Sequence, residues 1–244
     1  MKNVKLTIAY DGTNYSGWQF QINARTVQEE IQKALKIIMK KDIKINGSGR
    51  TDAGVHALEQ VANFKADFTI PVDRIPVAMN GLLPPDIAIK KAEDVDMNFH
   101  ARYSSKGKRY IYKIYNAKVR NPLYRNYSYF VNREIDINKI KEASKYFLGE
   151  HDFKAFMTKG SSIKTTVRTI YSINVYKRDD FIVIDYKGNG FLYNMVRIIT
   201  GTLLDVNFGK INMEDLEDII RLKDRNKAGH TAPAEGLYLA EVYY

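Results

Sequence analysis

The hydrophobic pattern of this chain switches repeatedly between a period of two and a period of about 3.6, and this switching limits the possible fold more than any other feature. In "VKLTIAY" (4–10), apolar residues occupy every second position, as in a half-buried strand. In "VQEEIQKALKIIMK" (27–40), apolar residues recur at helical spacing. The sequence therefore predicts a strand followed by a helix.

The same two patterns continue along the rest of the chain. Helices are expected at about 72–82 and 137–148, with two more before a final strand at 236–244. Strands are expected at about 43–48, 58–65, 87–93, 110–115, 127–131, 169–177 and 181–186. Mixed helices and half-buried strands indicate an α+β architecture of two similar halves, 1–105 and 106–244, each a mainly antiparallel sheet with helices on one face.

Length and composition exclude several classes of protein. A chain of 244 residues with 45% hydrophobic residues suits one large folded domain or two small ones. The absence of cysteine excludes disulfides, thiolate metal sites and thiol nucleophiles. The first residues lack the apolar core of a signal peptide, and Arg197 and Asp205 interrupt the most apolar helical stretch. We therefore expect a cytoplasmic protein that does not span a membrane.

Positive charge is concentrated in two windows that lack acidic residues. The formal net charge is +10, and no acidic residue lies between Asp96 and Glu134. Aromatic residues interleave with the basic ones there, so the window could bind nucleic acid, with RNA favoured because aromatic rings stack on unpaired bases. A solvated basic face over a Tyr-rich core is the alternative. The basic residues of the first window are Arg102, Lys106, Lys108, Arg109, Lys113, Lys118, Arg120, Arg125 and Arg133, and those of the second are Lys154, Lys159, Lys164, Arg168, Lys177 and Arg178.

The glycine-rich loop "NGSGRTDAGVHA" (46–57) is the main candidate site. It lacks the Gly-Lys-Ser/Thr ending of a phosphate-binding loop and the glycine spacing of a dinucleotide site, and Ser48 lacks a nucleophile-elbow pattern. The four histidines are scattered, which argues against a catalytic zinc site. Asp52 remains, two residues after Arg50, whose charge would favour an ionised carboxylate able to act as nucleophile or base. On the spacing alone, an aspartate that only stabilises a turn is the favoured explanation.

Five motifs, in order along almost the whole chain, resemble those of the tRNA pseudouridine synthase A family (TruA). "GRTDAGVHA" resembles the catalytic motif of that family. The other four are "YDGTNYSGWQFQ" (10–21), "KRYIYKIYN" (108–116), "GNGFLYNMVRIITGTL" (188–203) and "AGHTAPAEGLYLAEVYY" (228–244). One departure is His230, which stands where the family often has proline or another small residue.

The resemblance implies a pseudouridine synthase fold whose sheets are joined around a central active-site cleft. It implies an isomerase that converts uridines 38, 39 and 40 of the tRNA anticodon stem-loop to pseudouridine, works as a homodimer and needs no cofactor or metal. By resemblance, Asp52 is the nucleophile, Arg50 and Arg197 are active-site basic residues, Tyr110 stacks on the target base and Leu237 lines the pocket.

Each of these roles has a simpler rival. Tyr110 could be one more strand aromatic, Arg197 could extend to the surface from its helix, and Leu237 is by default a core residue. For the whole protein, a non-catalytic RNA-binding or RNA-chaperone module explains the charge and the tyrosines, and an enzyme of free nucleotides is a more distant alternative. The RNA-binding module leaves the Arg50 and Asp52 loop without a purpose.

Overall fold

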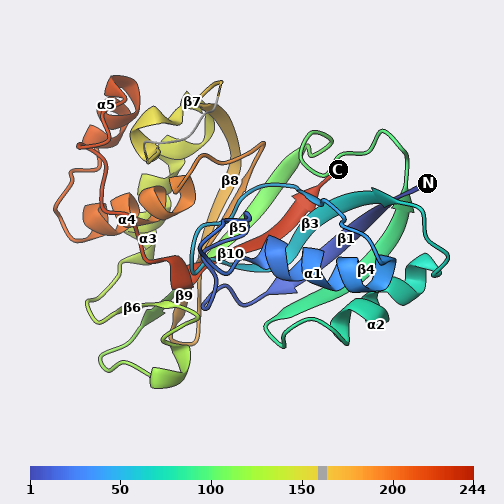
Figure 1. The fold of residues 1–244 in the computed structure, drawn as a ribbon. Helices are drawn as coiled ribbons and strands as arrows, with labels where there is room; N and C mark the ends of the chain where they lie inside the picture. Colours follow the sequence, from blue (N-terminus) through green and yellow to red (C-terminus); the bar gives the residue numbers. More distant parts are fainter. Residues whose placement is uncertain (159–163) are drawn as a thin grey trace. The chain divides into compact units, whose positions relative to one another are not determined.

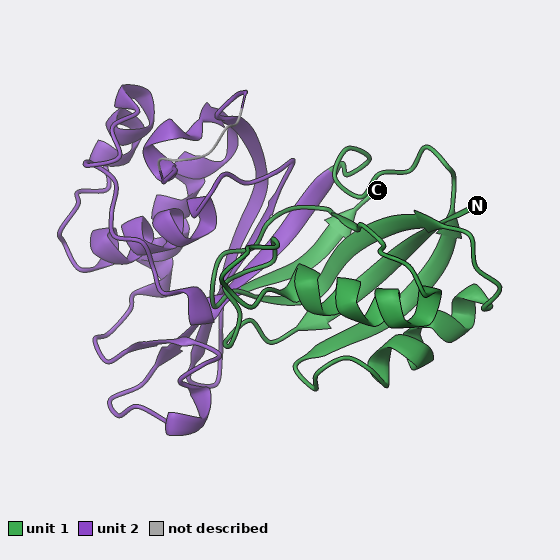
Figure 2. Cartoon of the chain, viewed as in Figure 1, with its two compact units in different colours: residues 1–106, 238–244 green, residues 107–237 purple. Residues whose placement is uncertain are grey.

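The computed structural model describes residues 1–158 and 164–244, which form two compact units (Figures 1 and 2). Unit 1 consists of residues 1–106 and 238–244, and unit 2 consists of residues 107–237. The sequence alone assigned the final strand to the second half. In the structure its residues 238–244 group with unit 1, where Tyr238 and Leu239 pair with a strand of that unit. Lys159 of the second basic window lies outside the described residues.

Unit 1 is built on a sheet with strand order β4-β1-β3-β10. β1 is antiparallel to both β3 and β4. β10 is parallel to β3, and its residues Tyr238 and Leu239 pair with His56 and Ala57 at the start of β3. β2 pairs with β3 further along, where Asn46 and Gly47 oppose Asn63 and Ala62. The bounds are Lys2–Tyr10 for β1, Asn46–Gly47 for β2, His56–Ala66 for β3, Ile87–Val95 for β4 and Leu237–Tyr243 for β10.

Two helices, α1 (Val27–Met39) and α2 (Ile75–Asn80), lie on one face of this sheet (Figure 1). α1 begins where the Thr26 hydroxyl accepts a hydrogen bond from the backbone N–H of Glu29, and it ends at Lys40 in the left-handed conformation. Its buried stripe of Val27, Ile31, Ala34 and Leu35 and the fully buried β1 residues Val4, Leu6 and Ile8 contribute to the core of unit 1.

Unit 2 is built on a sheet with strand order β5-β9-β8-β7, in which all neighbours are antiparallel. A short strand, β6, pairs parallel with β5. The prediction of an α+β protein with mainly antiparallel sheets is confirmed. The bounds are Gly107–Asn116 for β5, Tyr129–Val131 for β6, Gly149–Asp152 for β7, Val167–Arg178 for β8 and Phe181–Gly188 for β9.

Helix α4 lies at the centre of unit 2 and is buried along most of its length. The Tyr186 hydroxyl and the Thr200 hydroxyl, 2.8 Å apart, join β9 to α4, and α3 packs on both α4 and β8. Within the described residues, no helix is long and apolar enough to cross a membrane. The helices of unit 2 are α3 (Ile137–Ser144), α4 (Met195–Asn207) and α5 (Asp215–Leu222).

Short 3₁₀ turns occur in both units of the described chain. Unit 1 contains η1 (Val72–Arg74), and unit 2 contains η2 (Pro122–Tyr124), η3 (Lys145–Phe147), η4 (Phe153–Phe156) and η5 (Ala234–Gly236).

Three predicted elements differ from the structure. The strand expected at 43–48 shrinks to Asn46–Gly47, which pair with Asn63 and Ala62 of β3. The helix expected at 72–82 divides into η1 and α2, and Pro76 lies in the first turn of α2, where a missing N–H costs least. The helix expected at 137–148 becomes 3₁₀ after Ser144. β7 was not predicted.

Candidate active site

The loop that carries Asp52 joins β2 to β3 in unit 1 and is held from beneath by β1. Thr51 is buried, and its hydroxyl lies 2.7 Å from the hydroxyl of Tyr10. Asp52, the next residue, is half-buried, and its carbonyl accepts a hydrogen bond from the backbone N–H of Val55 at 3.1 Å. Gly54 turns the chain with a φ of 78°. The anchored Thr51 thus fixes the backbone from which Asp52 projects.

The segment 11–18 forms a wall against this loop. The backbone N–H of Trp18 donates to the Thr51 carbonyl at 3.1 Å, and the N–H of Gly54 donates to the Tyr15 carbonyl at 3.3 Å. Gly17 has a φ of 91°, and a Cβ atom there would lie 2.5 Å from the Thr51 oxygen. The glycine of "YDGTNYSGWQ" is therefore required by a close approach of two backbones. The sequence showed both motifs but not that one supports the other.

Gln60 of β3 secures the start of the loop. Its side chain is fully buried; its Oε1 accepts from the Ser48 hydroxyl at 2.6 Å and from the backbone N–H of Val61 at 3.1 Å, and its Nε2 donates to the Gly49 carbonyl at 3.0 Å. Ser48 therefore has a structural hydrogen bond. A buried polar side chain with three bonds holds the loop in one conformation.

Tyr10 and Arg50 differ in their burial, one below the Asp52 loop and the other within it. Burial raises the pKa of Tyr10 well above its ordinary value, and the charge of Asp52 adds to this shift, so Tyr10 is a neutral hydroxyl below the loop. Arg50 is exposed and forms no ion pair with Asp52 or with any other described residue. Between these two residues, Thr51 is buried and its hydroxyl contacts that of Tyr10.

Two further groups near the loop were not singled out from the sequence. His56 begins β3 and is 2% exposed; its Nδ1 accepts from the backbone N–H of Gly12 at 3.1 Å and lies 3.1 Å from a carboxylate oxygen of Asp11. Its ring stacks on that of Tyr238, the second residue of β10, at 4.8 Å. In the sequence, only the position of His56 within the loop motif could have indicated these contacts.

Unit 2 carries Tyr110, Arg197 and Leu237. Tyr110 lies in β5 opposite Tyr186, is 7% exposed and meets the edge of Phe191 with ring centroids 5.2 Å apart. Leu237 is buried at the start of β10. Both side chains are thus well packed, so their exposure alone does not distinguish a functional role from a core role.

Arg197 is held in place by two hydrogen bonds at the first turn of α4. Its Nε donates to the Ala232 carbonyl at 2.7 Å and its Nη1 donates to the Asn194 side chain at 2.8 Å. Asn194, which precedes the helix, is in the left-handed conformation and donates to the Thr158 hydroxyl at 2.9 Å. A cation at a helix N-terminus is unfavourable for the helix itself, so this placement suits a partner with negative charge.

The "KRYIYKIYN" motif and the carboxy-terminal motif meet at Tyr112. The Tyr112 hydroxyl donates to the Pro233 carbonyl at 2.7 Å, and a Cβ atom on Gly236 would lie 2.7 Å from the Tyr112 ring. Burial raises the pKa of Tyr112 well above its ordinary value, so it stays a neutral donor. This contact and the Arg197 bond fix the segment before Leu237 from two sides.

Part of the basic first window is structural. Arg109 makes a bidentate ion pair with Asp185, at 2.7 Å from Nη2, and burial lowers the pKa of Lys113. In the second window, Arg168 donates to two backbone carbonyls and burial lowers its pKa. The sequence therefore overestimated the surface charge of these windows.

The loop 117–127 keeps an exposed basic surface, which we call the basic loop. No described carboxylate forms an ion pair with its cations, Lys118, Arg120 and Arg125. Tyr124 packs on Tyr115 and Phe181 with ring centroids 5.1 and 4.9 Å apart, which anchors this part of the loop to the sheet of unit 2. The side chains of Tyr124 and Tyr127 are partly exposed beside these charges. Charge and aromatic surface together suit a polyanion with bases, such as RNA.

In the described parts of the chain, no three His, Asp or Glu side chains gather as a metal ion would require. The chain matches a family model described as tRNA pseudouridine synthase over residues 6–104 and 143–244. That match includes Asp52, Arg197 and Leu237, whereas Tyr110 and the basic loop lie in the unmatched interval.

Curated relatives match the whole chain. The protein named tRNA pseudouridine synthase A of Acetivibrio thermocellus is 52% identical, and that of Ruminiclostridium cellulolyticum is 53% identical; each match covers 100% of both chains. Among solved structures, a chain of an archaeal box H/ACA sRNP Nop10-Cbf5 complex is 14% identical with a TM-score of 0.37, covering 81% of this chain and 41% of that one. This last likeness is too weak to support an argument.

Proposed function

The chain belongs to the tRNA pseudouridine synthase A family, and from this premise we propose that it isomerises uridine to pseudouridine at positions 38, 39 and 40 of the tRNA anticodon stem-loop. It is an isomerase that acts on tRNA. The positions and the residues that perform the reaction are the proposal.

The observation that supports the proposal is that hydrogen bonds hold the backbone around Asp52 in one conformation. A half-buried carboxylate projects from a loop that Tyr10, Trp18 and Gln60 hold by hydrogen bonds. Preorganised groups are effective in catalysis because they need no rearrangement during the reaction.

The reaction requires little more than that carboxylate. The bond from uracil N1 to ribose C1′ breaks, the uracil turns, and a bond from C5 to C1′ forms, while the proton on C5 is lost and N1 gains one. Asp52 either attacks C1′ or removes a ribose proton, and both routes return the carboxylate unchanged. Since no electrons or groups are gained or lost, we propose that the chain works without cofactor or metal.

The other site residues act on the substrate around the reacting base. A uridine must leave its stack to react, which costs roughly a few kcal/mol, and the ring of Tyr110 would replace part of the lost stacking. Arg197, a cation at a helix N-terminus, and exposed Arg50 would hold phosphate or developing negative charge. Leu237 would supply an apolar wall to the pocket.

The basic loop is proposed to hold the body of the tRNA, since its three cations have no carboxylate partner among the described residues. We also expect a homodimer in the cytoplasm. Sedimentation equilibrium tests the oligomeric state, and a fully active monomer would remove the dimer from the proposal.

The decisive experiment measures tritium release from tRNA labelled at uridine C5. Asp52→Asn keeps the shape of the side chain and removes its charge, and we expect it to be inactive, as is Asp52→Ala. The matched control is Asp73→Ala, a carboxylate of the same unit that is 77% exposed and far along the chain from the loop. It should keep normal activity.

Each outcome separates the proposal from its rival. An Asp52→Asn variant that releases tritium near the wild-type rate would refute the catalytic role of Asp52. A wild type that binds tRNA and releases no tritium would favour the non-catalytic RNA-binding module. Mapping pseudouridine in the product tests the three positions separately from the reaction.

A further inference from the structure

The chain from Gly229 to Pro233 lies directly against helix α4. A Cβ atom on Gly201 of α4 would lie 1.8 Å from the His230 carbonyl oxygen, and one on Gly229 would lie 2.5 Å from the Thr202 Cα. The backbone N–H of Gly229 donates to the Thr202 hydroxyl at 2.9 Å. Two glycines therefore permit a contact that any other residue would prevent.

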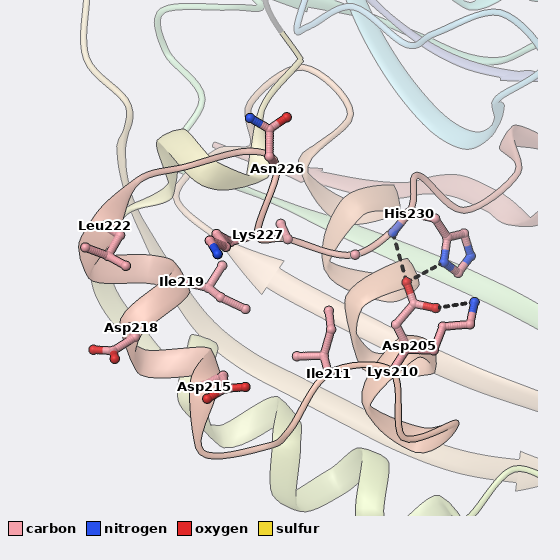
Figure 3. A pocket seen from close by; sticks show the side chains of 12 residues that line it. Asp205, Lys210, Ile211, Asp215, Asp218, Ile219, Leu222, Asn226, Lys227 and His230 are labelled. Atoms are coloured by element: carbon pink, nitrogen blue, oxygen red, sulfur yellow. Dashed lines mark hydrogen bonds and ion pairs between the residues drawn. The ribbon is translucent and has the colours of Figure 1, made fainter.

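His230 fastens this segment to Asp205 of α4. Its backbone N–H and its Nδ1 both donate to the same carboxylate oxygen, at 3.0 and 2.9 Å, and Lys210 Nζ lies 3.1 Å from the other oxygen (Figure 3). Burial alone would raise the pKa of Asp205, but the bonds from His230 and Lys210 outweigh it and lower the pKa. Asp205 is thus an ionised acceptor for both bonds from His230.

Two residues further on, Ala232 and Arg197 form a reciprocal pair. The backbone N–H of Ala232 donates to the Arg197 carbonyl at 3.1 Å, and the Arg197 Nε donates to the Ala232 carbonyl at 2.7 Å. Ala232 is fully buried. The Ala232 carbonyl, together with the Asn194 side chain, therefore helps to orient the Arg197 guanidinium.

We propose that His230, held by Asp205, is a positioning residue for Arg197. The imidazole fixes the segment 229–232 on α4, and the Ala232 carbonyl then orients the guanidinium. This inference rests on the proposed role of Arg197 in the reaction.

A second brace limits the effect of losing His230. Arg225 donates to the Gly229 carbonyl at 3.0 Å and to the Thr231 hydroxyl at 3.1 Å. Without the imidazole, the segment should therefore loosen but stay in place. We expect a misplaced Arg197 and a slower reaction, with unit 2 still folded.

The test compares three variants. His230→Ala removes the bond to Asp205, whereas His230→Asn offers an amide N–H close to the position of Nδ1 and should restore it. Lys210→Ala is the matched control, because Lys210 contacts the same carboxylate but no residue of the segment 229–232. Tritium release gives kcat and KM, and hydrogen exchange at the Ala232 amide reports its bond to Arg197 directly.

For His230→Ala we expect kcat to fall about tenfold with KM changed less than about twofold, since small displacements of a catalytic group reduce rate strongly. Ala232 exchange should become faster. His230→Asn should recover most of both properties, and Lys210→Ala should resemble the wild type.

Unchanged Ala232 exchange or unchanged kcat in His230→Ala would overturn the proposal. An equal loss in Lys210→Ala would also overturn it, because it would assign the effect to the unpaired charge of Asp205. An active Arg197→Ala variant would instead refute the proposed role of Arg197, whereas the exchange result for Ala232 would still report the positioning contact.

Discussion

Replacing Gly17 by alanine should displace the Asp52 loop and lower activity, although the new methyl group is not expected to contact the substrate. A left-handed conformation costs a non-glycine residue about 1–2 kcal/mol. The new Cβ would also lie 2.5 Å from the Thr51 oxygen, 3.1 Å from the Asp52 carbonyl carbon and 3.3 Å from the Ala53 nitrogen. All three are backbone atoms, so a rotamer change cannot relieve the contact.

Gly149→Ala is a matched control for the backbone cost. Gly149 has a φ of 90°, against 91° for Gly17, yet its Cβ would meet only the His151 Nε2 at 4.0 Å. Both variants place an alanine at a φ near +90°, and only Gly17→Ala brings a Cβ atom against the backbone of the Asp52 loop. The difference between the two isolates the contact.

The magnitudes follow from these distances. Gly149→Ala should lower Tm by about 2–8 °C, from 1–2 kcal/mol in a chain of this size. Gly17→Ala should lose about 1–3 kcal/mol more through overpacking. Because the Thr51 carbonyl must retreat by roughly 1 Å to restore ordinary contact, Asp52 should move with it, and activity should fall about 100-fold.

The assay is tritium release from C5-labelled tRNA at a temperature well below either Tm, with Tm measured by circular dichroism. Gly149→Ala should keep at least about a third of wild-type activity, since its Cβ atom would meet no backbone atom within 4 Å and would displace no neighbouring segment. Equal activities of the two folded variants would refute the reasoning that the wall of residues 11–18 positions Asp52.

Two further predictions concern charge. Burial would raise the pKa of Asp152, but hydrogen bonds from Thr166 and Lys223 outweigh it and lower the pKa. The contribution of Asp152 to stability is therefore present above the unfolded pKa of 3.8 and is lost as the pH falls through the folded pKa. The free energies of unfolding of the wild type and of Asp152→Asn, measured in urea, should converge in acid, and a difference that stays constant with pH would contradict this. Replacing Arg120 and Arg125 together by alanine should weaken tRNA binding and reduce the slope of log K against log salt by about 1–2, and an unchanged slope would show that the basic loop does not contact phosphates.

The sequence predicted most elements because their periodicity is local. The alternating pattern of 4–10 and the helical spacing of 27–40 are both visible within a few residues. β7 was missed because "GEHD" has no strand preference and becomes a strand only by pairing with β8. Pairing partners are tertiary information that one sequence does not contain.

The candidate site was predictable only by family resemblance, and its supports were not predictable at all. Tyr110 and Tyr112 are two residues apart on one strand and so share a face. Periodicity therefore cannot tell which of them binds Pro233 and which packs on Phe191. Likewise, a glycine at position 17 is compatible with a positive φ, but nothing in the sequence shows that the Thr51 backbone lies against it.

The placement of β10 in unit 1 has a consequence for synthesis on the ribosome. β3 leads directly out of the Asp52 loop, and β10 covers its first residues, where Tyr238 pairs with His56 and the two rings stack. While residues 107–237 are being translated, this stretch of β3 has an open edge that could pair with another nascent chain. The unit that is made first is therefore finished last, and a fragment ending at residue 106 should be prone to aggregation rather than a usable minimal domain.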